Sequence, residues 1–147
     1  MNILFLCVAN SARSQIAEGL ARSMFGADSD IRSAGSSPSG LVHPNAVSTM
    51  NEIGIDISSH RSKSIDDIEE DFMNNLDYVI TLCAEEICPV INSNAEMLHW
   101  INPDPDIKSL NSKELEKSFK QTREDIYKLL KKFLILNTWI KILLAYS

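Results

Sequence analysis

The 147 residues of this chain suit one domain with one hydrophobic core, and 44% hydrophobic and 23% charged residues are ordinary for a soluble globular protein. The formal net charge of −6 argues against a nucleic-acid-binding protein, because there is no basic surplus to neutralise phosphates. The apolar first residues lack a basic segment and lead directly into the polar Asn10 and Ser11. We therefore expect no signal peptide and a cytoplasmic protein.

The chain has three cysteines, Cys7, Cys83 and Cys88, and this odd count excludes a fully paired disulfide framework. In a reducing cytoplasm, cysteines tend to be buried, bound to metal or chemically active. Zinc is a weak option, since the sequence has no Cys-x2-Cys pair and its three histidines are scattered. We predict neither a metal nor a cofactor.

The first half of the sequence alternates predicted strands and helices. Residues 2–7 form an apolar run that is typical of a strand buried on both faces. Apolar residues at helical spacing predict a helix over residues 14–26, and residues 30–35 form a second predicted strand. Pro44 suits the first turn of a helix that runs to Gly54.

The second half continues this alternation. We predict a helix over residues 65–76, strands over residues 76–83 and 95–101, and a long amphipathic helix over residues 111–136. The side chains of the long helix that are predicted to face inward are Leu115, Phe119, Ile126, Leu129, Leu130 and Phe133.

The last segment differs in composition from the helix before it, so we divide the chain into a domain (1–134) and an apolar tail (135–147). Asn137, Thr138 and Lys141 interrupt the tail, which is too short and too broken to span a bilayer core about 30 Å thick. A continued C-terminal helix, or an extension, that packs on the domain is the simplest interpretation. Self-association and a role at a membrane surface stay open.

Strands that alternate with helices indicate an α/β fold, here a three-layer doubly wound sheet of four parallel strands with helices on both faces. Ligands of such sheets bind beyond the carboxyl ends of the strands, where the strand order switches. Cys7 ends the first predicted strand, Cys83 ends the third, and Asp104 follows the fourth. The topology therefore brings three chemically capable side chains to one edge.

The loop after Cys7 has the features of an oxyanion site. A loop between a strand and a helix can direct several backbone N–H groups into one concavity, and the helix dipole adds positive potential there. Arg13 adds a fork of donors that can hold two oxygens. Such a field favours a thiolate at Cys7, which is the nucleophilic form. A buried strand cysteine beside an arginine at a helix start is the alternative, because Cys-x5-Arg is a loose pattern.

The sequence "CVANSARS", followed by "QIAEG", resembles the phosphate loop of the low-molecular-weight protein tyrosine phosphatase family. "SAG", "GIDIS" and the later "DP" also match. "TLCAEEICP" and "HWINPDP" are similar to the hallmarks of the thioredoxin-coupled arsenate reductases within this family. The resemblance covers about residues 2–134 and implies the low-molecular-weight phosphatase-like fold.

The resemblance implies a role for each matching residue. Cys7 is the nucleophile, Arg13 grips the oxyanion, Asn10 and Ser14 order the loop, and Ser14 also hydrogen-bonds the sulfur. Asp104 is the general acid, although without the resemblance a solvated turn aspartate is the simpler interpretation. The implied oxyanion-binding loop consists of Val8, Ala9, Asn10, Ser11, Ala12, Arg13 and Ser14.

Two reactions start from such a site. A reductase relay passes the oxidation from Cys7 to Cys83 and then to Cys88, whose disulfide thioredoxin reduces. A phosphatase instead hydrolyses a phosphocysteine formed from phosphotyrosine or a small phosphoester. A third alternative is a module that binds an oxyanion or senses oxidation without turnover, and Cys83 and Cys88 are then buried filler.

Some departures from the family pattern bear on this choice. Asp106 stands where the phosphatases usually place an aromatic residue, and Ala12 stands where they often carry a second cysteine. Ala9 replaces a glycine, so a positive φ at this residue would carry a steric cost. The Cys83–Cys88 gap is short, which implies either an abbreviated helix or a smaller rearrangement, and leaves glutathione with glutaredoxin open as the reductant.

Some relatives bind a potassium ion beside the loop. Asn10, Glu18 and Ser33 match three of the ligands, but Lys63 takes the place of the fourth, an aspartate. We expect the Lys63 ammonium to replace the cation and pair with Glu18, with a solvated surface lysine as the alternative.

Overall fold

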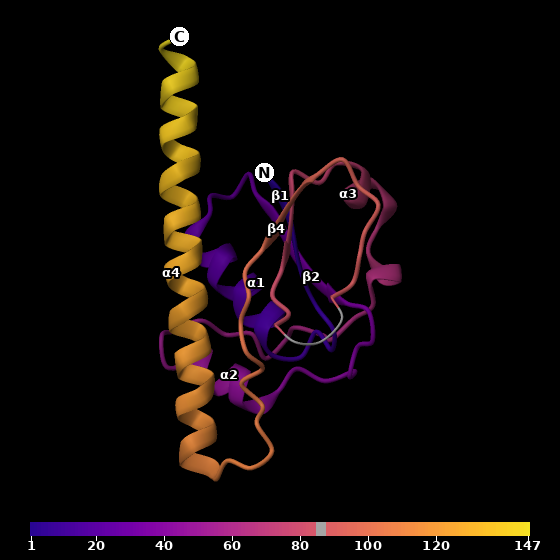
Figure 1. Ribbon diagram of the computed structural model, residues 1–147, viewed down its shortest axis with the longest axis vertical. Helices are drawn as coiled ribbons and strands as arrows, with labels where there is room; N and C mark the ends of the chain where they lie inside the picture. Colours follow the sequence, from indigo (N-terminus) through magenta and orange to yellow (C-terminus); the bar gives the residue numbers. More distant parts are fainter. Residues whose placement is uncertain (85–87) are drawn as a thin grey trace.

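The computed structural model describes residues 1–84 and 88–147, and a four-stranded parallel sheet forms the centre of this part (Figure 1). Its strands lie in the order β2-β1-β3-β4. The chain leaves β1 on one side to form β2 and returns on the other side to form β3, so the switch point lies at the carboxyl end of β1. The strands are β1 (Asn2–Cys7), β2 (Asp30–Gly35), β3 (Tyr78–Thr81) and β4 (Glu96–His99).

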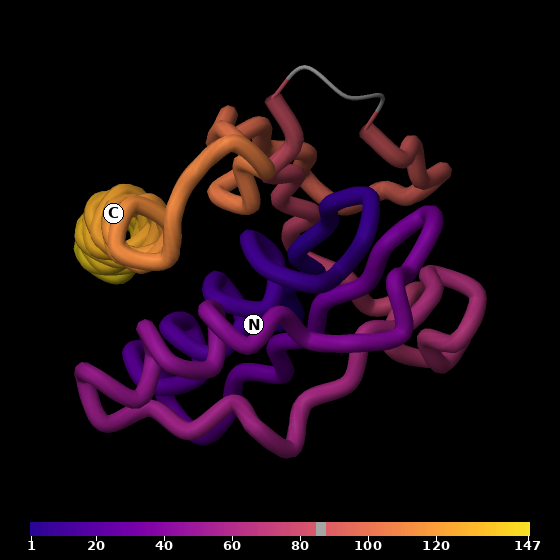
Figure 2. Tube along the Cα trace, turned by 90° about the horizontal axis from the view of Figure 1, so that it is seen from below, coloured from indigo at the N-terminus to yellow at the C-terminus, as the bar shows by residue number. Residues whose placement is uncertain are grey.

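Helices cover both faces of the sheet, which confirms the predicted three-layer doubly wound architecture (Figure 2). Successive side chains of β1 point to opposite faces. Phe5 therefore belongs to the larger core beneath α1, α2 and α4, while Leu6 belongs to the smaller core, which contains Phe72 of α3. The helices are α1 (Arg13–Met24), α2 (Pro44–Asn51), the 3-10 turn η1 (Ile65–Asp67), α3 (Glu70–Asn74) and α4 (Ser112–Ala145).

The continuous helix predicted over residues 65–76 is wrong. The structure has two short pieces there, separated by Ile68, whose backbone is extended at φ −80° and ψ 133°. Ser64 and Asp67 form a capping box in which each side chain accepts from the other residue's backbone N–H. Aspartate and serine side chains favour such local turns over helix interiors, and this local preference outweighs the helical spacing.

The long helix α4 begins where the sequence predicts. The side chain of Asn111 accepts from the N–H of Glu114 at 2.9 Å, and the Glu114 carboxylate accepts from the N–H of Asn111 at 3.1 Å. Leu115 and Leu129 are only half-buried. The predicted inward-facing residues that are buried are Phe119, Ile126, Leu130 and Phe133.

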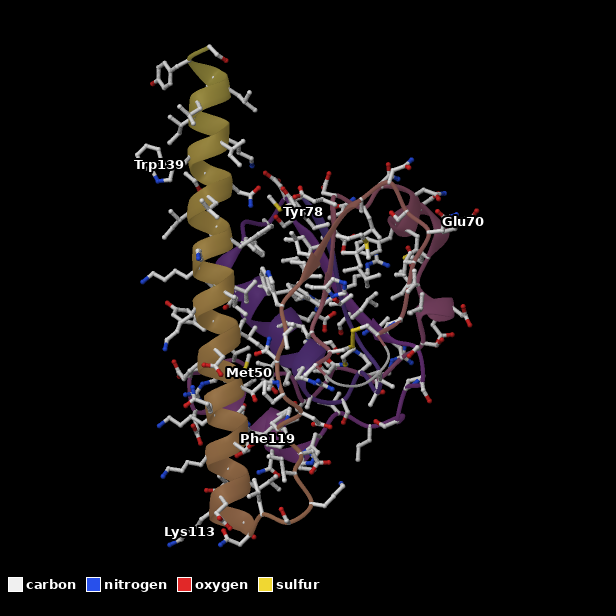
Figure 3. All side chains as sticks on the ribbon, in the orientation of Figure 1. Met50, Glu70, Tyr78, Lys113, Phe119 and Trp139 are labelled. Carbon is white, nitrogen blue, oxygen red and sulfur yellow. A yellow bond between two sulfur atoms is a disulfide. The ribbon has the colours of Figure 1, made fainter. Side chains whose placement is uncertain are left out.

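The helix does not end at residue 136 but continues through the tail to Ala145, beyond the rest of the molecule (Figures 1 and 3). Tyr78 donates to the side chain of Asn137 at 3.1 Å, which ties the start of the tail to β3. Beyond that point Trp139 is 60% exposed and Leu144 is 72% exposed. The expected packing of the tail on the domain is therefore confined to its first turn. Across the described residues, no helix combines the length and apolarity that crossing a membrane requires.

Candidate active site

A pocket of about 160 Å³ lies at the carboxyl ends of the strands. It brings together Cys7, Arg13 and Asp104. Of the three side chains that were predicted to meet at one edge of the sheet, Cys7 and Asp104 line this pocket, whereas Cys83 is not among its lining residues. The other residues that line it are Ala9, Ser11, Ala12, Ser39, His43 and Asp106.

Cys7 is a free, buried thiol at the end of β1. Its sulfur lies 2.8 Å from the hydroxyl oxygen of Ser14, as the resemblance implied, and accepts from the backbone N–H of Asn10 at 3.2 Å. These two contacts hold the sulfur in place at the start of the loop that follows β1.

The loop after Cys7 is turned so that its amides face inward. The carbonyls of Val8, Ala9 and Ser11 accept from backbone N–H groups of the 37–43 segment, at 2.9 to 3.0 Å. In a planar trans peptide the C=O and the following N–H point in opposite directions. The N–H groups that follow these three carbonyls are therefore directed toward the pocket, and the one on Asn10 reaches Cys7.

The packing of this loop also explains the glycine of "SAG". A side chain on Gly35 would place its first carbon 2.3 Å from the carbonyl oxygen of Val8, which is far closer than atoms can approach. Only glycine allows β2 and the loop to lie this close together.

Asn10, and not Ala9, carries the positive φ among the described non-glycine residues, at 48°. The predicted steric cost at Ala9 therefore does not arise, because asparagine tolerates this region of backbone space better than other side chains. The Asn10 amide is fully buried and donates to Ser14 at 2.8 Å and to Ser33 at 3.0 Å. Its oxygen accepts from Gln15 and from the backbone of Lys63.

Arg13 begins α1 and is 6% exposed. One of its terminal nitrogens donates to the carbonyl of Asn102 at 2.9 Å and to that of Leu82 at 3.4 Å. These two carbonyls follow β4 and β3, so the guanidinium joins three strand ends in one place. Asn102 was not among the predicted site residues, and its one signal in the sequence is its position just before the "PDP" segment.

Asp104 lines the pocket from the segment after β4. One of its carboxyl oxygens accepts from the backbone N–H of Asp106 at 3.0 Å. The hydrogen bond from Lys108 is the main cause that lowers the pKa of Asp106 below its ordinary value, and electrostatic attraction to His43 and Lys108 adds to it. Asp106 is therefore a carboxylate at neutral pH.

Cys83 and Cys88 form a disulfide, with their Cα atoms 5.7 Å apart (yellow bond in Figure 3). Cys83 lies two residues after the end of β3 rather than on the strand, and it is 4% exposed. Leu82, the residue before it, continues the pairing with β1 and also contacts Arg13. The short helix considered between the two cysteines falls on residues 85–87, outside the described residues.

The predicted contact between Lys63 and Glu18 is wrong. In the described part of the chain, Glu18 pairs instead with Arg22 at 3.3 Å and with His60 at 3.0 Å, and Lys63 donates to the carbonyl of Arg61. Burial lowers the pKa of Lys63, although the charge of Glu18 partly opposes this. Residues 1–84 and 88–147 contain no group of three or more His, Cys, Asp or Glu side chains suited to hold a metal ion.

A parallel sheet with a cysteine at its switch point, inward-facing amides and a buried arginine defines a class of α/β proteins that bind tetrahedral oxyanions beside a thiol. Residues 2–141 match the family described as low molecular weight phosphotyrosine protein phosphatase, and the chain belongs to this family.

Three similar proteins within the comparison are arsenate reductases. An arsenate reductase of Halalkalibacterium halodurans is 42% identical over 133 residues, which are 89% of this chain and 93% of the relative. A solved arsenate reductase in its phosphate-binding state is 29% identical, with a TM-score of 0.71 and coverage of 90% and 95% of the two chains. A thioredoxin-dependent arsenate reductase of Corynebacterium glutamicum is 28% identical, with a TM-score of 0.64, and the match covers 90% of this chain and 61% of that one.

Proposed function

We propose that this chain is an arsenate reductase that uses Cys7, Cys83 and Cys88 in sequence and receives its electrons from thioredoxin in the cytoplasm. The observation that carries the proposal is the coexistence of two sulfur states in one chain. Cys7 is a free thiol in an oxyanion pocket at the end of β1, while Cys83, which follows the neighbouring strand β3, forms a disulfide with Cys88.

In the first step, the Cys7 thiolate attacks arsenic and displaces the hydroxyl oxygen of hydrogen arsenate. Asp104 gives that oxygen a proton, so that it leaves as water. Arg13 and the inward-facing amides of the loop (residues 8–14) stabilise the negative charge on the remaining oxygens. The product is an adduct with a sulfur–arsenic bond, and arsenic has not yet been reduced.

In the second step, Cys83 attacks the sulfur of Cys7. The electron pair of the sulfur–arsenic bond stays on arsenic, which leaves as arsenite, and a Cys7–Cys83 disulfide forms. In the third step, Cys88 attacks the sulfur of Cys83 and frees Cys7 as a thiolate. The two sulfurs that lose the two electrons end as the Cys83–Cys88 disulfide, which is the state of the described structure.

The proposal also names the reductant that restores the two thiols after each turnover. A dithiol such as thioredoxin can attack the Cys83–Cys88 disulfide and restore both thiols. Glutathione with glutaredoxin could supply the same electrons. The sequence similarity to a thioredoxin-dependent enzyme favours the first, and an assay with each reductant separates them.

A phosphatase is the second candidate, because the family match and the first chemical step are common to both activities. The rim of the pocket favours the reductase. Asp106 is an ionised carboxylate there, so a phosphotyrosine peptide would meet negative charge where its ring needs an apolar wall. We expect phosphomonoester hydrolysis as a side activity at most.

The test couples arsenate reduction to NADPH oxidation through thioredoxin and thioredoxin reductase. Cys7→Ser should abolish turnover, and Cys83→Ser and Cys88→Ser should each abolish it while leaving any hydrolysis of p-nitrophenyl phosphate intact. Arsenate turnover that survives both Cys83→Ser and Cys88→Ser would refute the relay. Strong phosphatase turnover without arsenate reduction would assign the chain to the second candidate.

A further inference from the structure

We propose that His43 is a positioning residue that holds Asp106, and through Asp106 the carboxyl group of Asp104, at the mouth of the pocket. The inference rests on the proposed function, in which Asp104 supplies a proton. All three residues line the same pocket but come from segments about 60 residues apart in sequence. Neither His43 nor its contact with Asp106 could be read from the sequence.

His43 is fixed from three directions. It caps α2, because its ring nitrogen Nδ1 accepts from the backbone N–H of Asn45 at 3.0 Å. Its ring packs on Phe119 of α4, with 4.6 Å between ring centroids. The backbone N–H of His43 donates to the carbonyl of Ser11 in the oxyanion loop. The imidazole therefore has one orientation relative to both the loop and the long helix.

The cap also decides where the proton of the neutral ring lies. Since Nδ1 accepts a hydrogen bond, it carries no proton, and the proton is on Nε2. Nε2 lies 3.4 Å from one carboxyl oxygen of Asp106. The other oxygen of Asp106 pairs with Lys108 at 2.8 Å, so both oxygens of this carboxylate are engaged.

Asp106 then acts on Asp104 through its backbone. Its N–H donates to one carboxyl oxygen of Asp104 at 3.0 Å. The hydroxyl of Ser118 on α4 holds the carbonyl of Pro105, between the two aspartates, at 2.9 Å. The N–H group of Asp106 can only donate, so the Asp104 oxygen that faces it acts as the acceptor of this hydrogen bond. The other carboxyl oxygen of Asp104 is therefore the one that carries the catalytic proton.

Position matters here because a general acid must lie within hydrogen-bond reach of the departing oxygen. Asp104 is an exposed residue, and without such contacts it would sample several rotamers. A displacement of about 1 Å can cost on the order of a hundredfold in rate. Loss of the His43 contact should therefore slow the proton-dependent step and leave oxyanion binding to the loop and Arg13 unchanged.

The test uses two matched variants of His43. The side-chain oxygen of His43→Asn lies at about the place of Nδ1. This variant therefore keeps the hydrogen bond from Asn45 that caps α2 but loses the contact with Asp106. Gln in His43→Gln reaches Asp106 with its amide and loses the cap. The measurement is the single-turnover rate of arsenite formation by the fully reduced full-length protein, with phosphate inhibition as the measure of oxyanion binding.

His43→Asn should lower the single-turnover rate by about tenfold or more, with the phosphate inhibition constant within about twofold of wild type. His43→Gln should retain most of the rate but unfold at lower urea concentration. Asp106→Ala should match His43→Asn, and the double variant should be no slower than either single one, because both remove the same contact.

Hydrogen exchange of the Asp106 amide provides a readout that does not depend on activity. Exchange should be about tenfold faster in His43→Asn than in the wild-type protein, because the segment that holds this hydrogen bond is released. Unchanged exchange together with an unchanged rate would overturn the proposal, and so would a rate loss matched by an equal loss of phosphate binding. If the wild-type protein forms no arsenite, the proposed function fails, and the exchange measurement alone decides the role of His43.

Discussion

The side chain of Asn10 offers the sharpest test of how this site is built. It is fully buried and makes four hydrogen bonds, two as donor to Ser14 and Ser33 and two as acceptor from Gln15 and Lys63. Its backbone also has a φ of 48°, which most side chains disfavour. Asn10→Ala removes all four hydrogen bonds and keeps a side-chain carbon at the strained position, whereas Asn10→Gly removes the hydrogen bonds and relieves the strain.

The expected losses of stability follow from the four hydrogen bonds and from the strained backbone of Asn10. Four hydrogen bonds at a net of about 0.5–1.5 kcal/mol each, with partners left buried, predict a loss of roughly 3–5 kcal/mol for Asn10→Ala. Asn10→Gly should be more stable than Asn10→Ala by about 1 kcal/mol, because glycine adopts positive φ without a steric cost. Either loss is a large part of the roughly 5–15 kcal/mol that stabilises a typical domain.

Urea unfolding followed by far-ultraviolet circular dichroism measures both variants. The expected order of unfolding midpoints is wild type, then Asn10→Gly, then Asn10→Ala. Gln121→Ala serves as a control, since within residues 1–84 and 88–147 this exposed side chain bonds to Asp125 of the same helix alone and should change the midpoint little. A midpoint for Asn10→Ala equal to that of wild type, or above that of Asn10→Gly, would refute the reasoning.

Three further predictions concern the Cys7 thiol, the half-buried Lys63 and the tail. In the disulfide form, where alkylation reports Cys7 alone, Ser14→Ala should slow alkylation by iodoacetamide at neutral pH about tenfold, since a hydrogen bond to a charged group is worth roughly 1.5 kcal/mol. An unchanged rate would show that Ser14 does not stabilise the thiolate. Because burial lowers the pKa of Lys63 below its ordinary 10.5, the folded chain loses this proton at a lower pH than the unfolded chain does. The free energy of unfolding should therefore rise as the pH increases from the folded-state pKa toward 10.5, and urea titrations of Lys63→Met at alkaline pH should lack this part of the rise; the same slope in both proteins would contradict it. Ending the chain after residue 134 should leave arsenate turnover within about twofold, as expected for removal of an exposed segment far from the chemistry; a larger loss in the coupled assay would contradict the proposed domain boundary.

The tail prediction follows from where the tail lies. The residues around its base include Met1, Asp77, Tyr78 and Glu96, which stand at the amino ends of the strands. The candidate active site lies at the carboxyl ends, so the whole length of the sheet separates the two. We accordingly propose residues 1–134 as the catalytic domain, with the role of residues 135–147 separate from the reaction.

The sequence was sufficient for the fold wherever burial repeats regularly. The unbroken apolar run of β1 reflects a strand covered on both faces, and the spacing in α1 and α4 reflects one buried face each. It was insufficient where local side chains compete with the helix, as at Ser64 and Asp67, because periodicity does not register such turns. It also favoured a helix that continues into the tail, which the structure confirms because Asn137 and Thr138 bond within the helix and do not stop it, but it overestimated how far the tail packs on the domain.

For the candidate site, topology made the largest contribution. Knowing that parallel strands share a carboxyl edge was enough to bring Cys7 and Asp104 together. His43 and Asn102 could not be found this way, because each depends on a contact with one atom of a distant segment. Periodicity and motif spacing predict the path of the backbone. Contacts such as those of His43 and Asn102 depend instead on how loops from distant parts of the chain pack against each other.

The hydrogen bonds that fix the oxyanion loop are made mainly by its backbone carbonyls and by the side-chain amide of Asn10, rather than by the sulfur of Cys7. During one proposed turnover that sulfur would bond first to arsenic, then to another cysteine, and then to neither. The oxyanion loop therefore does not have to refold after each change of bonding at the sulfur, so a new anion can bind as soon as the thiolate is released. A serine in place of the nucleophile should consequently yield an inert receptor of native shape, suited to trapping the bound anion for crystallography.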